Sequence, residues 1–144
     1  PSVSELVQGG HAYLVSYLGA DYGEMPYTGF VATDKFIAEH PDVIQRYTNA
    51  IYRAQKYVFA TDPEVVAQEV AQFFEGTDVE LLASSIRRYR DEGGWVTTPV
   101  MNPADYDKLQ DLMIAGGVLE PHQRAPFDAI ATNQFAEEAV KQVK

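Results

Sequence analysis

The chain has 144 residues, 46% of them hydrophobic and 12% aromatic, and its 21 acidic and 11 basic residues give a formal net charge of −10. This composition predicts a folded, core-forming chain of about one domain and argues against general binding to nucleic acid or to an anionic membrane surface. The sequence has no cysteine, which excludes disulfides, thiol catalysis and cysteine-ligated metal sites. Small molecules and proteins remain as partners.

The first 33 residues are expected to hold the β-structure. Two runs rich in β-branched and aromatic residues, 12–18 and 27–33, are separated by Gly and Pro residues typical of turns. They predict two strands joined by a loop. Because two strands alone form a marginal sheet at best, we expect further strands to come from upstream sequence or from another copy of the chain. On this interpretation the 144 residues are the C-terminal part of a larger, helix-rich α/β protein.

Five helices are predicted in the remainder of the chain. Three of them have Pro at the first helical position, after His40, Asp62 and Asn102, and another begins with a capping box at residues 77–80. The fifth helix is expected to begin near 132 or 133. Glycines end three of the five helices, at 76, 93–94 and 116–117. Apolar residues spaced by three and four predict the buried faces, which include Ile44, Ile51, Val66, Val70, Leu82, Ile86, Leu109, Phe135, Ala139 and Val140.

The sequence contains no recognisable catalytic or metal-binding motif. His11, His40 and His122 are scattered, and no phosphate-binding loop, dinucleotide fingerprint or nucleophile elbow occurs. We therefore expect no catalytic residue, no metal site, no cofactor and no enzyme activity. Trp95, just after a helix stop, is expected to lie in the core more readily than in a ligand cleft.

The loop from Gly19 to Gly29 is the best candidate for a binding segment. It combines two carboxylates, two tyrosines, a threonine and three glycines. Glycine lets a ligand approach the backbone closely, tyrosine offers an apolar ring with a polar tip, and a carboxylate can accept hydrogen bonds from an ammonium group. An ordinary turn exposed to solvent remains the alternative.

The run from Asp21-Tyr-Gly through His40-Pro-Asp to Ala50 resembles the periplasmic substrate-binding proteins of the nitrate, sulfonate, taurine and thiamine-pyrimidine group of ABC importers. The tail at 126–139 resembles the closing segment of that family. Its members consist of two α/β lobes around a cleft. The resemblance implies that the chain is the C-terminal portion of such a fold, with residues 1–33 as strands and interlobe crossing and residues 34–144 as the helical part of a lobe.

The resemblance also implies a function without chemistry. A solute-binding component would capture a small polar molecule in the interlobe cleft and present it to an ABC permease, in a periplasmic or extracytoplasmic location and without inserting into the membrane. The lack of cysteine separates the chain from a related enzyme branch that has a cysteine-rich motif and an iron site. The alternative function is an all-helical protein-interaction module with a capping β-hairpin. The residues implied to contact ligand are Glu24, Tyr27, Thr28 and Gly29, followed by Asp21 and Tyr22.

Overall fold

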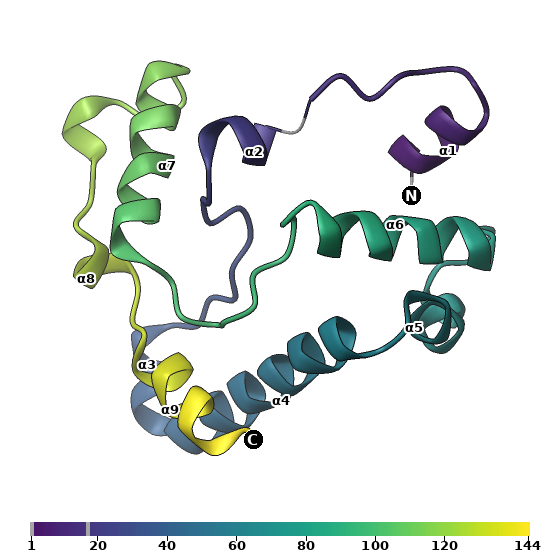
Figure 1. Ribbon diagram of the computed structural model, residues 1–144. Helices are drawn as coiled ribbons and strands as arrows, with labels where there is room; N and C mark the ends of the chain where they lie inside the picture. The colour runs from purple at the N-terminus through teal and green to yellow at the C-terminus, as the bar shows by residue number, and fades with distance from the viewer. Residues whose placement is uncertain (1, 17) are drawn as a thin grey trace. The chain divides into compact units, whose positions relative to one another are not determined.

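The computed structural model describes residues 2–16 and 18–144, which form helices joined by irregular segments (Figure 1). The chain divides into two compact units. Unit 1 consists of Pro1–Gly23 and Ala54–Thr97, and unit 2 consists of Glu24–Arg53 and Thr98–Lys144. The boundary between them falls within helix α4 (Pro41–Ala60). None of the helices in the described ranges is both long enough and apolar enough to cross a membrane.

Both predicted strands are wrong. Residues 12–16 are irregular, Leu18 begins the short helix α2 (Leu18–Tyr22), and Tyr17 lies outside the described residues. The second run is irregular from 23 to Thr33, whose side chain caps helix α3 (Asp34–Glu39). A strand is stable only when a neighbouring strand takes up its backbone hydrogen bonds, and no strand occurs in the part of the chain that the structure describes. The predicted α/β fold class is therefore wrong, because the described residues form helices without strands. The prediction that the chain is the C-terminal part of a two-lobed α/β fold is wrong with it.

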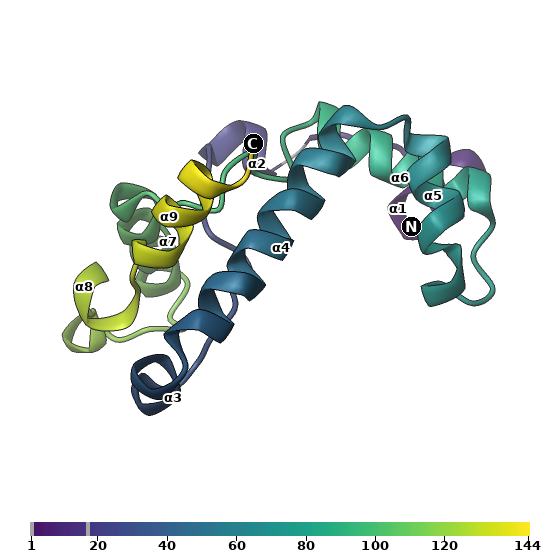
Figure 2. The ribbon, with the colours of Figure 1, turned by 90° about the horizontal axis from the view of Figure 1, so that it is seen from below.

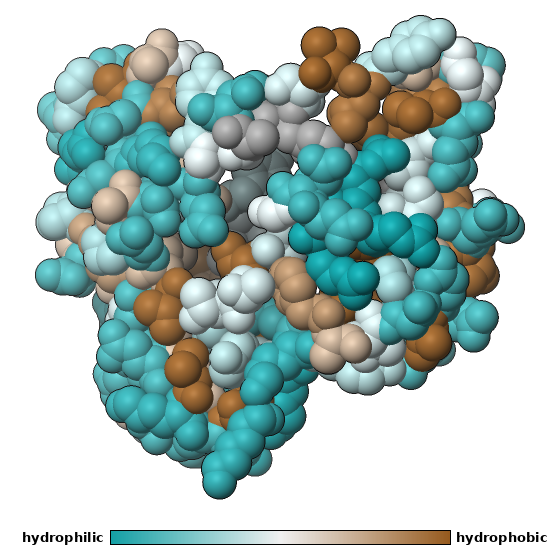
Figure 3. Space-filling model, viewed as in Figure 1, coloured by the Kyte–Doolittle hydropathy of each residue, from teal (hydrophilic) through white to brown (hydrophobic). Residues whose placement is uncertain are grey.

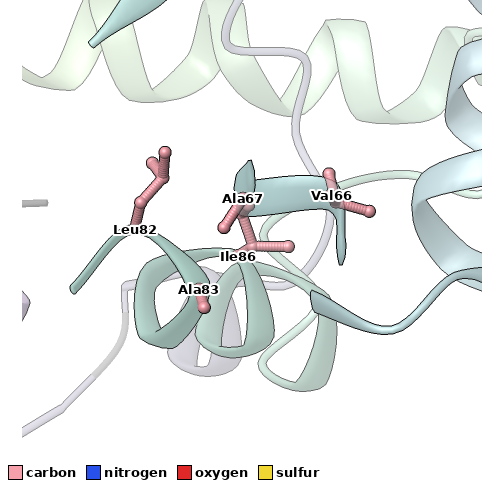
Figure 4. Close-up of a cluster of buried hydrophobic side chains, with 5 residues drawn as sticks. All are labelled: Val66, Ala67, Leu82, Ala83 and Ile86. Atoms are coloured by element: carbon pink, nitrogen blue, oxygen red, sulfur yellow. The ribbon is translucent and has the colours of Figure 1, made fainter. Parts of the chain in front are cut away.

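Unit 1 is built around the pairing of α5 (Pro63–Val70) with α6 (Val79–Asp91). A short 3₁₀ turn, η1 (Ala71–Phe73), follows α5. Helix α1 (Ser2–Gln8) packs on α6, where the hydroxyl oxygens of Ser4 and Ser85 lie within hydrogen-bond distance, at 3.2 Å. The core of the unit consists of buried side chains from α5 and α6 (Figure 4), namely Val66, Ala67, Leu82, Ala83 and Ile86.

Local capping fixes the helix starts in unit 1. The Asp62 carboxylate accepts from the Glu64 N–H at 2.9 Å, as its position before Pro63 predicts. Helix α6 is capped by Asp78, which accepts from the N–H groups of Glu80 and Leu81 at 2.8 and 3.3 Å, so the capping box beginning at Thr77 is wrong by one residue. A carboxylate satisfies the orphan N–H groups as a hydroxyl would and also favours the positive end of the helix dipole.

Unit 2 combines the first part of α4 with α3 and the C-terminal helices. Helix α9 (Gln134–Gln142) lies alongside α4 (Figures 1 and 2): Gln45 Nε2 donates to the Phe135 carbonyl at 3.0 Å and Asn49 Nδ2 to Gln142 Oε1 at 2.7 Å. Phe135 and Ala139 are buried as predicted, whereas Val140 is 43% exposed, so its predicted burial is wrong. The remaining elements of the unit are α7 (Pro103–Ala115), η2 (Pro121–Gln123) and α8 (Phe127–Ile130).

Two side-chain amides hold the irregular segments of unit 2. Gln110, buried on α7, donates to the Ala125 carbonyl at 3.1 Å and accepts from the Ala125 N–H at 2.9 Å. Asn133 bonds to Met101 in the same manner, at 2.7 and 3.0 Å. Each amide supplies the pair of backbone hydrogen bonds that a neighbouring strand would otherwise provide. Irregular backbone is thereby fixed without a sheet.

Candidate functional site

The candidate site is an irregular segment of unit 2 that is held at both ends. At its start, Lys108 Nζ on α7 donates to the Glu24 carbonyl at 2.9 Å and pairs with Asp105 Oδ1 at 3.3 Å. At its end, the Phe30 ring packs edge-on against Tyr47 of α4, with ring centroids 5.0 Å apart and an interplanar angle of 81°. We call residues 24–30 the tethered segment.

Between its two attachments the tethered segment presents its functional groups to solvent. Met25 and Pro26 are half-buried, whereas Glu24, Tyr27 and Thr28 are exposed, Tyr27 at 97%. A Cβ added at Gly29 would meet no described atom within 4 Å, so space is open beside this part of the backbone. A carboxylate, a phenol and a hydroxyl are therefore available together, next to a backbone that a small molecule can approach.

Asp21 and Tyr22 are not part of the tethered segment, because they belong to helix α2 of unit 1. The Asp21 carboxylate accepts from the Ser16 hydroxyl at 2.6 Å, and Tyr22 is 56% exposed. Gly23 ends the helix with φ of +76°, a left-handed conformation that glycine adopts without strain. Four of the six predicted residues thus lie within the tethered segment, where they are close in sequence, and the other two lie on a different element.

Sequence reasoning missed Lys108. Its ammonium group places a positive charge against the backbone of the tethered segment, although Lys108 and Glu24 are 84 positions apart in the sequence. The only local sign is an acidic residue three positions earlier, Asp105, which is ordinary pairing on a helix surface. A contact of this kind becomes visible only when the fold is known.

Two hollows lie outside the predicted segment. In unit 2 an open hollow of about 470 Å³ lies around α8 and the start of α9, and its wall includes Phe127, Asp128 and Glu137. In unit 1 an apolar hollow of about 280 Å³ is lined by residues of α4, α5 and α6 together with Phe74 and Trp95. Neither hollow is lined by any of the six predicted ligand-contacting residues. Trp95 is 38% exposed, so its expected position in the core is wrong.

The described residues show no preformed metal centre. No group of three or more His, Asp or Glu side chains among them is arranged to hold a metal ion. The chemistry that the tethered segment offers is hydrogen bonding and charge pairing with a bound solute.

The chain is similar to a known protein. The chain is 27% identical over 142 residues to the "Putative binding protein YtlA" of Bacillus subtilis (strain 168), and the alignment covers 99% of this chain and 42% of that protein. The chain thus spans less than half the length of the curated relative that it matches. No family model matches the chain. No solved structure matches it either. The chain is therefore similar to a protein named for binding, and that name specifies neither a ligand nor a transport system.

Proposed function

We propose that this chain works in a solute-binding protein that captures a small polar molecule and passes it unchanged to an ABC permease in the membrane. The observation that carries the proposal is the similarity to YtlA, a protein named for binding, over 99% of the chain. The resemblance of residues 21–50 to the nitrate, sulfonate, taurine and thiamine-pyrimidine group supports the importer class and a periplasmic or extracytoplasmic location.

The tethered segment is the proposed point of contact with the solute. Glu24, Tyr27 and Thr28 are exposed within one stretch of five residues, and they can donate and accept hydrogen bonds around a molecule with several polar groups. The contacts of Lys108 and Phe30 at its two ends reduce the conformational entropy that the segment loses on binding.

The carboxylate of Glu24 favours one class of solute within the group. A carboxylate facing a sulfonate or nitrate would repel it, whereas an amine or aminopyrimidine N–H would donate a charge-assisted hydrogen bond to it. We therefore place taurine, through its ammonium group, and the aminopyrimidine of thiamine ahead of nitrate and simple alkanesulfonates.

A thermal-shift measurement tests the proposal. The protein is heated with each of nitrate, taurine, an alkanesulfonate and the thiamine aminopyrimidine in large excess, with sodium chloride at matched ionic strength as the control. Binding to the folded state alone raises Tm, by several degrees when the ligand is present at about 100 times its Kd. An increase with an amine-bearing solute supports the proposal, and an unchanged Tm with all four contradicts it.

A helical protein-interaction module is the second candidate function. Hydrophobic side chains gather over α1 and the segment that follows it (Figure 3), where Val3, Leu6, Leu14 and Val15 are exposed. Exposed apolar patches of this kind occur at protein interfaces. An interaction module would show no thermal response to any of the small solutes, so the same measurement separates the two functions.

A further inference from the structure

The apolar hollow of unit 1 has a buried floor. Val66 of α5 and Leu82 and Ile86 of α6 belong to the core of the unit (Figure 4) and also line this hollow. Val58 of α4 and Val70 of α5 add further aliphatic wall. Its volume of about 280 Å³ exceeds the roughly 150 Å³ of an apolar cavity that takes up benzene.

Aromatic rings form the mouth of the hollow. Trp95 stacks on Tyr89, with ring centroids 5.3 Å apart and planes inclined by 21°. Phe74, on the turn after η1, is 41% exposed and lines the same opening. These rings offer a bound molecule flat, polarisable surfaces against which another ring can stack or pack edge-on.

The hollow gives a guest molecule little hydrogen bonding. Its lining is apolar, and the hydroxyl of Ser85, which contributes to the wall, is already engaged with the Leu81 carbonyl at 2.9 Å and with Ser4 Oγ at 3.2 Å. A polar or charged molecule would lose its hydration there without replacement.

We propose that this hollow is a binding site for a small, uncharged aromatic molecule of one ring, held by Val66, Leu82 and Ile86 below and by Trp95 and Phe74 at the mouth. The lack of free polar groups and the aromatic side chains of the lining favour this class, and the volume is large enough for one ring. The site is distinct from the tethered segment in residues and in ligand chemistry, so it does not depend on the proposed capture of a polar solute.

The tryptophan at the mouth makes the site directly observable, because Trp95 is the single tryptophan of the chain. Titration with toluene should change Trp95 fluorescence saturably and raise Tm. Methylcyclohexane, which is of similar size but not aromatic, should bind several-fold more weakly. Benzoate should bind at least tenfold more weakly, because its charge would be buried unpaired. A fluorescence change that does not saturate, or equal responses to toluene and benzoate, would overturn the proposal.

Two variants locate the binding. Val70→Phe places a ring in the hollow and should reduce toluene binding at least tenfold, while Val140→Phe, at an exposed position of α9 in unit 2, should leave it unchanged. Phe74→Ala removes one ring from the mouth at an exposed position, where loss of folding is not expected, and should weaken binding several-fold. Toluene affinity that is the same in Phe74→Ala and in the parent protein would show that the molecule binds elsewhere.

Discussion

The start of helix α7 depends on a single side chain. Asn102 accepts a hydrogen bond from the Ala104 N–H at 3.0 Å, and Pro103 occupies the first helical position, where its missing N–H carries no penalty. We expect Asn102→Ala to lower the free energy of unfolding by about 1 kcal/mol, measured by urea denaturation. Asn102→Asp keeps a capping oxygen and should stay within a few tenths of the parent value. Equal stability of the alanine variant would show that the cap contributes nothing.

Glu138 on α9 gives the protein a component of stability that depends on pH. The hydrogen bond from Gln142 Nε2 at 2.9 Å, followed by the Lys141 ammonium at 3.5 Å, lowers the pKa of Glu138. Because the folded pKa lies below the unfolded one, the stabilisation is complete above the unfolded pKa and is lost as the pH falls through the folded pKa. The stability difference between the parent and Glu138→Gln should therefore shrink on going from about pH 6 to about pH 3. A difference that stays constant across this range would contradict the assignment.

At the scale of elements, the amide of Gln110 takes the place of a neighbouring strand. It is buried and hydrogen-bonds both the carbonyl and the N–H of Ala125. Gln110→Leu roughly keeps the volume but removes the side-chain partner of the N–H and carbonyl of half-buried Ala125, and a polar group left unpaired away from water costs about 1–3 kcal/mol. We expect denaturant unfolding to show a loss in this range, with Gln68→Leu on the exposed side of α5 as the control. A loss no larger than that of the control would mean that water satisfies Ala125.

Elements with local signals could be predicted from the sequence, and elements that depend on distant residues could not. Helices α4, α5 and α7 begin at Pro residues with an Asp or Asn cap or an acidic first turn, and all of that information lies within a few positions. The expected strands failed because β-rich composition does not supply a pairing partner. The short helix α1 was missed because its position depends on a contact between Ser4 and Ser85, 81 residues away.

The same distinction between local signals and contacts of distant residues applies to the candidate site. The prediction that residues 24–29 bind a ligand rests on their residue types alone. Their attachment to α7 through Lys108 and to α4 through Phe30 and Tyr47 was not, since these contacts join distant parts of the sequence. The residue types of the candidate site could therefore be read from the sequence, while the contacts that hold the segment required the fold.

At the scale of the whole molecule, the chain consists of two compact units, each with its own proposed binding surface. Unit 2 carries the exposed, polar tethered segment, and unit 1 carries an apolar hollow beside its core. Hydrogen bonds would hold a small polar solute, whereas burial of apolar surface would hold a small apolar ring. Binding at one surface is therefore expected to leave the chemistry of the other unchanged.

Isothermal titration calorimetry of Glu24→Gln is the most direct test of the proposed solute binding. The parent protein, Glu24→Gln and the matched variant Glu75→Gln, which alters an exposed carboxylate on the turn after η1, are titrated with taurine and with the thiamine aminopyrimidine. We predict that the parent and Glu75→Gln bind one of these solutes equally well, and that Glu24→Gln binds it at least about tenfold more weakly. Equal affinities for all three proteins, or no binding of either solute, would contradict the account.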